Sequence, residues 1–561
     1  MKDERFSAPS CVRGLSVTQM FVDRSVVPML VGLTLVTMLG AGCSDTTPAA
    51  PSTDGYRSID GTGNNTRNRL LGAANTRLVR WSRADYGDGV SEPAGIDLPS
   101  TRMVSNALCQ DVATATNEFG ASDFLWQWGQ FLDHDISLTE TAEPEEPMPI
   151  EVPLGDPSFD PQGTGTAVIE FSRSIFDRTT GTDEDNPREQ INEITHFIDA
   201  SLVYGSVEER ASALRADDGS GRLRMSEGNL LPFNTDGLPN AGGADDPALF
   251  LAGDVRANEQ VGLAAVHTLF VREHNRVADE LLANDPSMLG EEVYQLARRY
   301  VGALMQGITY NEFLPALLGP DALAPYEGYD SSVDPSIANE FSTGIYRFGH
   351  SALSANLLRL DADGDEIEEG HLGLRDAFFR PDRLAREGGI EPLLRGLAGQ
   401  ACSAVDTEVV DDVRDFLFGP PGAGGLDLAS LNLQRGRDHG LPRYNEVRAA
   451  LGLAVRQSFD EVSTNPDTRE RLSSVYDRVD DLDVWVGALA EDAINGGHLG
   501  ELAFVVMKRQ FEALRDGDRF WYERQLSDDE IDEIDSTTLA DVIRRNTTIG
   551  DELSDDVFHV R

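Results

Sequence analysis

The stretch at residues 124–135 holds the side chains best suited to acid–base chemistry. At about 100° per residue, Gln130, Asp133 and His134 gather on one side of a helix whose other side is apolar. A histidine on such a face is a candidate general base, although a polar face is more often simply solvated. Asp135 falls toward the apolar side, where a carboxylate needs a partner. No Lys or Arg lies in this stretch, so a bound cation is a reasonable candidate.

Oxygen ligands for such a cation occur at residues 195–201. In an extended segment alternate residues point the same way and offer hydroxyl, backbone carbonyl and carboxylate oxygens. These positions are Thr195, Phe197, Asp199 and Ser201. Oxygen ligation with two carboxylates suits Ca²⁺ better than a transition metal. The same alternation also arises by chance, so the spacing alone leaves a purely structural role open.

A second polar group follows at residues 253–260. If a helix begins there, Arg256, Glu259 and Gln260 share one face through their i, i+3, i+4 relation. Facing the first helix across a slot, Arg256 would be a fixed positive charge for a developing anion, with His134 as the base. An exposed face of salt bridges explains the same spacing equally well.

The elements that must position these groups are mainly helices. Apolar periodicity predicts helices at residues 121–139, 259–283, 290–318, 383–399 and 499–514. Loops are predicted at 140–160, 178–188 and 419–425, and strand-like alternation is scarce. We therefore expect a mainly α-helical single unit at residues 56–561.

Composition excludes some functions. The 561 residues include 47 Lys or Arg and 96 Asp or Glu, a formal charge of −49, and no basic run that could bind nucleic acid. The chain is 40% hydrophobic, with 24 Phe and 5 Trp, which is enough for an ordinary globular core. Four cysteines are too few for a disulfide framework.

The amino-terminal segment is typical of an export signal. Basic residues precede an uncharged apolar stretch at 26–42, which ends in small residues directly before Cys43. This pattern resembles a bacterial lipoprotein signal and predicts that residues 1–43 form an export signal in which Cys43 becomes the lipidated first residue. A plain secretory signal and an uncleaved anchor are the alternatives. Residues 44–55 suit a flexible tether. All three readings predict an exported protein, lipid-anchored in the cell envelope or secreted, which meets the membrane only through that anchor or signal.

Longer motifs resemble those of a known family. Trp-Gly-Gln-Phe-Leu-Asp-His-Asp at 128–135, Arg-Ala-Asn-Glu at 256–259 and His-Thr-Leu-Phe-Val-Arg-Glu-His-Asn at 267–275 are similar to the animal-type haem peroxidases of the peroxidase–cyclooxygenase superfamily. Further motifs follow in the family's order at 195–206, 346–350, 431–442 and 514–521. The resemblance implies a bacterial member with a mainly helical catalytic domain that holds haem b between helices.

The resemblance also implies roles for the polar residues around the haem. His134 would move the peroxide proton, Arg256 would stabilise negative charge as the O–O bond breaks, and Gln130 would hold water or an anionic substrate. On the other side of the haem, His350 would bind the iron. Asn432 would accept the hydrogen bond from the second ring nitrogen of that histidine.

Four more residues would hold the cofactor at its edges, and five would hold calcium. By resemblance, Arg347 and Arg435 approach the haem propionates, and Asp133 and Glu259 form ester bonds to haem methyl groups. Both carboxylates staying unlinked is the alternative. The family's calcium positions correspond to Asp135, Thr195, Phe197, Asp199 and Ser201.

The expected substrates are hydrogen peroxide and a small electron donor. Gln260 stands where one member has a methionine linked to haem through sulfonium, and that link cannot form here. A less oxidising haem favours iodide, bromide, thiocyanate or phenolic donors over chloride. Fatty-acid dioxygenase or cyclooxygenase activity would need a tyrosine three residues before the iron ligand, where this chain has Arg347, and Tyr346 is out of register. A non-catalytic surface binding or adhesion protein is the third reading.

The remaining histidines and tryptophans are expected to be structural. No metal-ligand spacing surrounds His267, His274 or His439, which favours packed and hydrogen-bonded roles. Trp485 and Trp521 are predicted to be core aromatics rather than electron-transfer relays.

Overall fold

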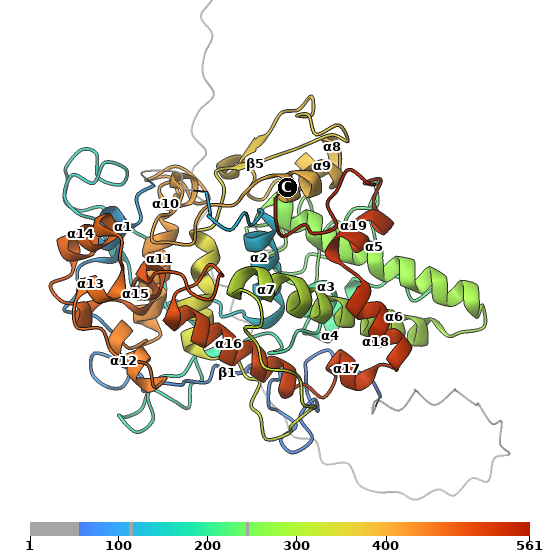
Figure 1. Cartoon of the computed structure of the whole chain (residues 1–561), viewed down its shortest axis with the longest axis horizontal. Helices are drawn as coiled ribbons and strands as arrows, with labels where there is room; N and C mark the ends of the chain where they lie inside the picture. The colour runs from blue at the N-terminus through green and yellow to red at the C-terminus, as the bar shows by residue number, and fades with distance from the viewer. Residues whose placement is uncertain (1–54, 112–115, 243–245, 561) are drawn as a thin grey trace, which may run out of the picture. The chain divides into compact units, whose positions relative to one another are not determined.

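The computed structural model describes residues 55–111, 116–242 and 246–560. These residues belong to one compact unit that is largely helical, as predicted (Figure 1). The predicted export signal at 1–43 with Cys43, and the tether at 44–55 up to residue 54, lie outside the described residues. No helix among the described residues is both long and apolar enough to cross a membrane.

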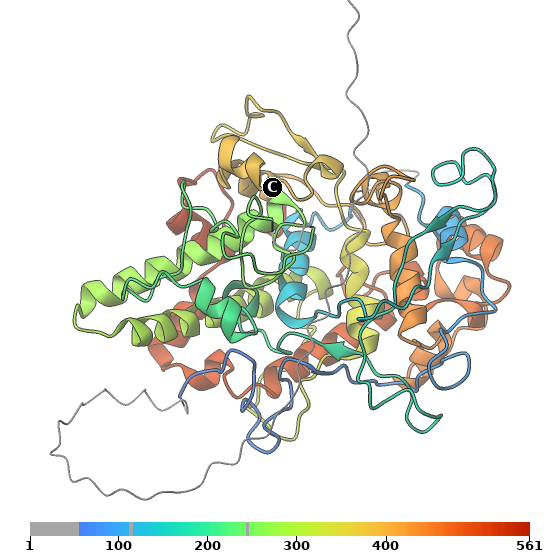
Figure 2. The same cartoon turned by 180° about the vertical axis from the view of Figure 1, so that it is seen from behind.

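Helices dominate both views of the described unit (Figures 1 and 2). Each strand in the described part of the chain is two residues long. The helices are α1 (Thr101–Leu108), α2 (Phe124–Ile136), α3 (Ser201–Tyr204), α4 (Glu208–Ala213), α5 (Val261–Asn284), α6 (Gly290–Ile308), η2 (Thr309–Phe313), α7 (Leu314–Leu318), η3 (Glu340–Ile345), η4 (Tyr346–His350), η5 (Leu374–Asp376), α8 (Pro381–Arg386), α9 (Glu391–Gly399), α10 (Asp411–Arg414), α11 (Leu428–Asp438), α12 (Tyr444–Ala450), α13 (Phe459–Val462), α14 (Pro466–Val475), η6 (Val479–Asp481), α15 (Val484–Ala490), α16 (Glu501–Asp516), α17 (Tyr522–Gln525), α18 (Asp528–Ser536) and α19 (Leu539–Asn546). Three antiparallel pairs join β1 (Thr76–Arg77) to β4 (Ile191–Asn192), β2 (Ile150–Glu151) to β3 (Val168–Ile169), and β5 (Asn356–Leu357) to β6 (Leu372–Gly373).

Two predicted helices are wrong in part. The helix expected at 383–399 is two helices, α8 and α9, because Gly388 and Gly389 both take positive φ, of 92° and 75°. This left-handed backbone ends a helix. The chain at 253–260 is a series of turns rather than the start of a helix, and α5 begins at Val261. A loop, not a shared helical face, therefore places Arg256 and Glu259.

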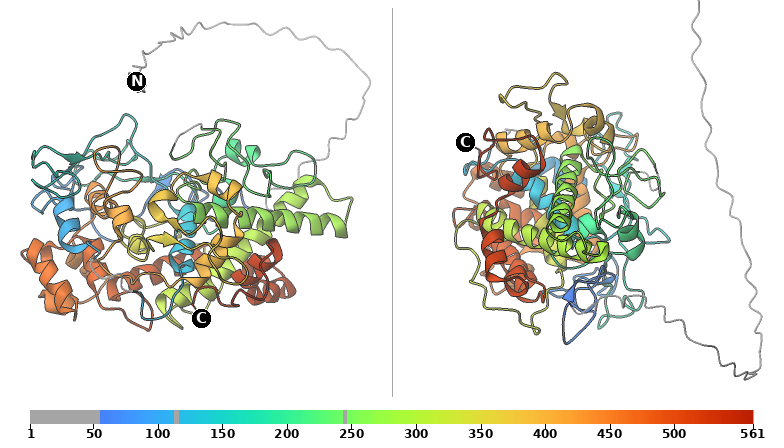
Figure 3. Two further views of the ribbon diagram at one scale, coloured as in Figure 1. Left: turned by 90° about the horizontal axis from the view of Figure 1, so that it is seen from above. Right: turned by 90° about the vertical axis from the view of Figure 1, so that its right-hand side faces the viewer.

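Helix α2 lies at the centre of the described unit. It packs against α3, α5, α9 and η4, and its rings Trp126, Trp128 and Phe131 are buried. Figure 1 shows α2 between a long hairpin of α5 and α6 on one side and the group α11 to α15 on the other, and the view from above shows the same order (Figures 1 and 3). Because both faces of α2 are buried, its polar residues must find partners inside the protein.

Candidate functional site

A cavity of about 400 Å³ separates the polar side of α2 from η4. Phe171, Phe348, Leu374 and Phe378 are among its apolar wall residues. The predicted site residues that line it are Gln130, Asp133, His134, Arg256, Glu259, Arg347, His350 and Arg435. Asn432 lies behind His350, to which it is hydrogen-bonded. The structure therefore gathers the predicted haem-site residues of four separate segments around one space.

His134 is the candidate base on the α2 side. Its imidazole is buried, with Nδ1 3.6 Å from Asp254 Oδ1 and Nε2 3.8 Å from Glu259 Oε2. Burial and the positive charge of Arg256 lower the pKa of His134 well below its ordinary value. The ring is therefore neutral at physiological pH and able to accept a proton.

Asp254 holds Arg256 in place, and the sequence interpretation did not include this carboxylate. Arg256 Nε and Nη2 donate to the two Asp254 carboxylate oxygens, both at 2.9 Å, and Nη2 also donates to Ser137 O at 2.8 Å. Arg256 lowers the pKa of the buried Asp254 against the effect of burial. The Gly-Asp-x-Arg spacing at 253–256 is a signal for such a bidentate pair, but it is too short to be distinctive alone.

Two further carboxylates face the cavity near Arg256. Asp133 lies 3.5 Å from Arg256 Nη1, and Glu259 accepts a hydrogen bond of 3.1 Å from the Gln130 amide. Burial raises the pKa of Asp133 to about 6 and that of Glu259 to about 7. Both groups therefore exist partly as neutral carboxylic acids near neutral pH.

Gln260 is fixed by the protein itself. Its side-chain oxygen caps α5 by accepting the Gly262 N–H at 2.6 Å. Its amide nitrogen donates to Gln127 Oε1 at 2.6 Å and to Gln130 Oε1 at 3.1 Å. This network places the Gln130 amide beside Glu259 and His134, at the wall of the cavity.

On the opposite wall, His350 ends the short helix η4. The oxygen and nitrogen of the Asn432 amide lie 3.1 Å and 2.8 Å from His350 Nδ1. Arg347 Nη1 donates to the Asn432 oxygen at 3.1 Å. If the amide oxygen accepts from the Nδ1–H, the lone pair of His350 is on Nε2 and is free to bind a metal. If the amide nitrogen donates instead, Nε2 carries the proton, so the amide orientation decides whether this histidine can be a ligand.

Arg347 is a half-buried cation without a carboxylate partner among the described ion pairs. Its Nε is buried and has no hydrogen-bond partner in the described part of the chain. Burial and the charges of Arg435 and Arg256 lower the pKa of Arg347 to about 10. A guanidinium whose Nε is buried and unpartnered would be stabilised by an anion placed in the cavity.

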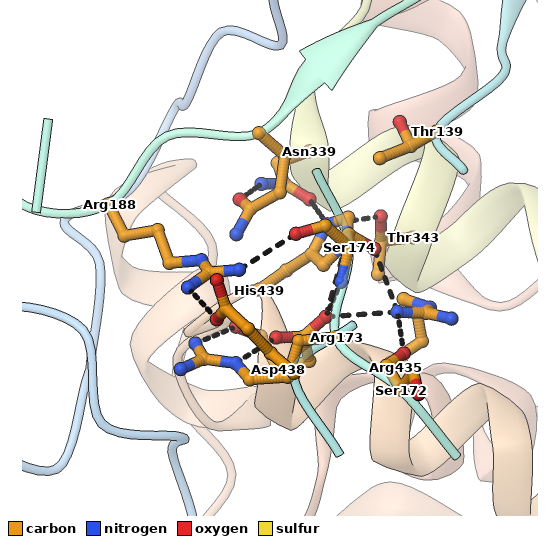
Figure 4. Close-up of polar contacts among 12 residues, drawn as sticks. Thr139, Ser172, Arg173, Ser174, Arg188, Asn339, Thr343, Arg435, Asp438 and His439 are labelled. Carbon is orange, nitrogen blue, oxygen red and sulfur yellow. Dashed lines mark hydrogen bonds and ion pairs between the residues drawn. The ribbon is translucent and has the colours of Figure 1, made fainter. Parts of the chain in front are cut away.

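Arg435 belongs to a polar network at the edge of the same cavity (Figure 4). Its Nη1 donates to Ser174 Oγ at 2.8 Å, to Asp438 Oδ2 at 3.0 Å and to Ser172 O at 3.0 Å. His439 completes the network through Ser174 Oγ at 2.8 Å. Burial lowers the pKa of Arg435 although Asp438 opposes this effect.

The donor set of this cavity fits a haem. The imidazole of His350 lies on one wall, and a base and an arginine lie on the other. Of the two arginines at the edge, Arg347 has no carboxylate partner among the described ion pairs and Arg435 shares Asp438 with Arg173. Arg347 Nε, which is buried and unpartnered among the described residues, is the observation that most directly calls for an anionic group. The apolar wall residues suit a planar ring system.

Hydrogen bonds join four of the five predicted calcium residues, Asp135, Thr195, Asp199 and Ser201, and none of these four lines the cavity. Asp135 accepts hydrogen bonds from the Asp199 and Ala200 N–H groups, both at 3.0 Å, and from Ser201 Oγ at 2.8 Å. Thr195 Oγ1 lies 3.1 Å from Asp199 Oδ1, while Asp199 Oδ2 is buried without a hydrogen-bond partner in the described chain.

The two carboxylates of this group, Asp135 and Asp199, form no ion pair with a basic side chain among the described residues. Burial, together with the charge of Asp199, raises the pKa of Asp135 to about 7, and burial raises the pKa of Asp199. Within the described ranges, no group of three or more His, Cys, Asp or Glu residues is placed to hold a metal ion. The Asp135 group has only two carboxylates, so hydroxyl and carbonyl oxygens would have to supply the other ligands.

The remaining histidines have protein surroundings. His274 bonds to Tyr204 OH at 2.8 Å and Gly221 O at 2.9 Å, and His196 bonds to Thr76 Oγ1 at 3.0 Å. The buried His267 packs its ring edge against Phe131, with centroids 5.0 Å apart. Of the histidines expected to be structural, only His439 lines the cavity.

Comparisons with known proteins agree with this geometry. A family model described as animal haem peroxidase matches residues 56–558. The chain is 39% identical to mouse (Mus musculus) thyroid peroxidase over 569 residues, covering 91% of this chain and 61% of that protein. It is 38% identical to human (Homo sapiens) eosinophil peroxidase over 545 residues, covering 86% of this chain and 74% of that protein. The chain thus spans about three fifths of the thyroid peroxidase length.

Solved structures are similar as well. Peroxidase A from Dictyostelium discoideum has a TM-score of 0.83 and 35% identity, covering 90% of this chain and 99% of that one. A fatty acid α-dioxygenase from Arabidopsis thaliana has a TM-score of 0.76 at 22% identity, covering 91% of this chain and 84% of that one. At that identity the second likeness concerns the fold alone.

Proposed function

This chain belongs to the animal haem peroxidase family, and we propose that it uses hydrogen peroxide to oxidise small anionic donors (iodide, bromide or thiocyanate) or phenolic donors. Animal haem peroxidases bind haem, and the cavity residues fit that group. The observation that carries the proposal is the neutral His134 beside Arg256, in a cavity whose opposite wall holds His350.

Peroxide chemistry needs a proton to move between two oxygen atoms. We assign this transfer to His134, whose neutral ring accepts the proton of bound peroxide and returns it to the leaving oxygen as water forms. Arg256 stabilises the negative charge that develops during the transfer. Its guanidinium stays protonated and is held in place by the two hydrogen bonds to Asp254. Gln130 holds water or an anionic donor beside these groups.

Four residues would hold the cofactor. His350 would bind the iron, Asn432 would fix the ring tautomer, and Arg347 and Arg435 would pair with the propionates. Bound haem supplies the electrons that break the O–O bond.

The experiment is peroxide reduction by the haem-loaded full chain and its His134→Ala variant. We expect the second-order rate with peroxide to fall by at least about 10²-fold in H134A, with haem retained. His559→Ala is the control, because that half-exposed ring pairs only with Asp556 in the described contacts. An unchanged rate in H134A would contradict the assignment of the base and favour the non-catalytic reading if wild type is also inactive.

The donor class follows from Gln260. A glutamine cannot form the sulfonium link, and its amide is already committed to Gln127 and Gln130. We therefore expect iodide, bromide, thiocyanate and phenols to be oxidised in preference to chloride. A chloride rate equal to the iodide rate would overturn this expectation.

We also propose ester links from Asp133 and Glu259 to haem methyl groups. Each ester would replace one methyl hydrogen by the carboxyl oxygen, and one hydrogen peroxide would be reduced to two waters. Both carboxyls line the cavity and are available in the protonated form. After peroxide treatment, acid–acetone should leave haem on the wild type and extract it from a D133N/E259Q double variant; free extraction from wild type would refute the esters.

A calcium ion in the Asp135 group is the second cofactor that we propose. The unpartnered Asp199 Oδ2 and the two buried carboxylates support it. Thr195, Phe197 and Ser201 would add hydroxyl and carbonyl oxygens. Metal analysis of the purified chain should find calcium that is lost in an Asp199→Asn variant.

For location, we propose export and lipid anchoring through Cys43, on sequence grounds alone. Fatty-acid labelling of the wild type that disappears in Cys43→Ala would support this proposal. Release of unlabelled protein would instead favour a plain secretory signal.

A further inference from the structure

An aromatic chain leads away from the cavity. It consists of Tyr346, Phe511, Tyr310, Trp521 and Tyr522, and we keep the name aromatic chain for these five residues. Tyr346 lines the cavity wall. Successive ring centroids are 6.1 Å (Tyr346 to Phe511), 6.0 Å (Phe511 to Tyr310), 4.7 Å (Tyr310 to Trp521) and 4.8 Å (Trp521 to Tyr522) apart. Electrons tunnel readily across such gaps, so the chain is a continuous electronic route.

The far end of the aromatic chain has bases for the protons of oxidised rings. Trp521 Nε1 donates to Glu523 Oε1 at 3.1 Å, and Tyr522 OH donates to Asp535 Oδ1 at 2.7 Å. Both carboxylates are exposed, although the two rings are buried. A proton released from either ring therefore reaches water through its acceptor.

The near end lacks such bases. Tyr346 OH is buried with no hydrogen-bond partner among the described residues, and Tyr310 OH donates to the Phe511 carbonyl at 2.5 Å. A carbonyl oxygen does not take up a phenolic proton at neutral pH. Because oxidised phenols are strongly acidic and are stabilised by losing that proton, neither tyrosine is a resting place for the oxidation.

Other tryptophans near the cavity differ in this respect. Trp485 Nε1 donates to the Arg347 carbonyl at 3.4 Å, which is not a base. Trp126 lines the cavity and donates to Asp123 at 2.9 Å, but Asp123 is buried and its proton would stay inside the protein. Trp521, by contrast, has ring contacts with Tyr310 and Tyr522 and donates its indole N–H to an exposed carboxylate.

The sequence alone favours a purely structural role for Trp521, but its ring contacts and its bond to Glu523 argue for more. We propose that the aromatic chain is a redox relay that draws oxidising equivalents out of the cavity to Trp521 and Tyr522 when no small donor is present. The inference rests on the proposed peroxidase function, which supplies the oxidant. In each pass one electron leaves the Trp521 indole for the peroxide-oxidised cavity, and the Nε1 proton moves to Glu523. A soluble one-electron reductant of the ascorbate type then returns one electron, and the indole regains its proton. Two passes supply two electrons, and with the two protons that the oxidised reductant releases to water they balance the reduction of one peroxide to two waters.

The site so defined is a second point of electron entry, away from the cavity. It differs from donor oxidation at the cavity because the reductant never contacts the cofactor. A reductant excluded from the cavity can then still restore the resting protein, and the cavity residues are spared from oxidation.

The test uses the haem-loaded full chain, mixed with one equivalent of peroxide and no donor. Spin trapping followed by peptide mass spectrometry should place adducts on Trp521 or Tyr522. In Trp521→Phe and in Glu523→Gln, adducts at these positions should fall by at least about tenfold, while iodide oxidation stays at the wild-type rate. Glu523 is exposed, so E523Q tests the relay even where W521F disturbs the core.

Tyr300→Phe is the matched control. Tyr300 OH donates to Glu533 at 2.5 Å, also on α18, but no ring contact described here links it to the aromatic chain. Y300F should therefore leave the adducts unchanged. Adducts confined to Trp126, or unaffected by W521F and E523Q, would overturn the relay. If peroxide produces no change in haem absorption at all, the proposed function itself fails, and the relay fails with it.

Discussion

Two buried aspartates beside α2 show opposite responses to burial. Asp254 and Asp135 are 3% and 0% exposed, yet the pKa of Asp254 is lowered while that of Asp135 is raised to about 7. The difference lies in the nearest charge, because Arg256 pairs with Asp254 and Asp199 stands beside Asp135. In the Asp254 centre an arginine pairs directly with the carboxylate. The carboxylates of the Asp135 centre form no ion pair among the described residues, and the charges of Arg57 and Arg298 lower the pKa of Asp199 without offsetting burial.

The two centres are joined by one residue. Leu202 N–H donates to Asp135 at 3.2 Å, and Leu202 C=O accepts the Asp254 N–H at 3.0 Å. A cation that orders the Asp135 group would therefore also steady the aspartate that holds Arg256. The proposed calcium site and the proposed peroxide site therefore share a backbone support at Leu202.

The largest expected effect comes from removing the charge of Asp254, which pairs with Arg256. Asp254→Asn keeps the shape but frees Arg256 from its bidentate partner, so the rate with peroxide should fall by about 10²-fold or more. Cyanide affinity for the haem-loaded protein should fall as well, because bound anions also depend on Arg256. Stopped-flow absorbance measures both quantities.

An exposed pair provides the control for this variant. Arg380 binds Asp382 through Nε at 2.8 Å and Nη2 at 2.9 Å, with the same separation of two residues. Asp382→Asn should change neither quantity, since exposed pairs contribute little. A D254N variant as active as D382N would mean that Arg256 needs no positioning.

The Asp135 centre should be sensitive to its cation. At calcium about 100 times the dissociation constant, binding would stabilise the fold by about 2.7 kcal/mol, which a chelator would remove. The effect of Asp199→Asn on the thermal midpoint should have opposite signs without and with calcium. Without calcium the substitution should raise the thermal midpoint by relieving the repulsion of Asp135, and with calcium it should lower it. Calorimetry of the wild type and D199N, with and without chelator, measures these midpoints. If the chelator changed the unfolding curve of neither protein, a cation site at Asp135 and Asp199 would be contradicted.

The sequence predicts the Asp135 centre better than the Asp254 centre. The residues of the Asp135 centre and Arg256 were predicted from motifs, as was the mainly helical fold. The Asp254 pair was missed because residues 253–260 were assigned to a helix, and helical geometry would have pointed Asp254 away from Arg256. The turns there depend on packing, since a Cβ at Gly253 would lie 2.3 Å from Ser201 O. Such a contact is set by the folded chain and leaves no local pattern.

A half-buried carboxyl, that of Glu312, gives the smallest expected effect. Glu312 accepts only the Leu539 N–H at 2.8 Å among the described hydrogen bonds, and burial with Asp556 and Asp541 nearby raises its pKa to about 8. Its contribution to stability is fully present below about pH 4.5 and is lost as the pH rises toward 8. Because water reaches part of the side chain, Glu312→Gln should gain only about 1 kcal/mol at pH 8 relative to pH 5. Urea unfolding at both pH values measures the gain, and an equal effect at both would refute the shift.

The most direct test of the central claim is the absorption spectrum of the calcium-loaded full chain, reconstituted with haem, before and after hydrogen peroxide. If the cavity holds haem through His350 and reacts through His134, a ferric Soret band should appear, shift within milliseconds of adding peroxide, and be lost or displaced in His350→Ala. A folded, calcium-loaded chain that takes up no haem, or whose band ignores peroxide, would contradict the account.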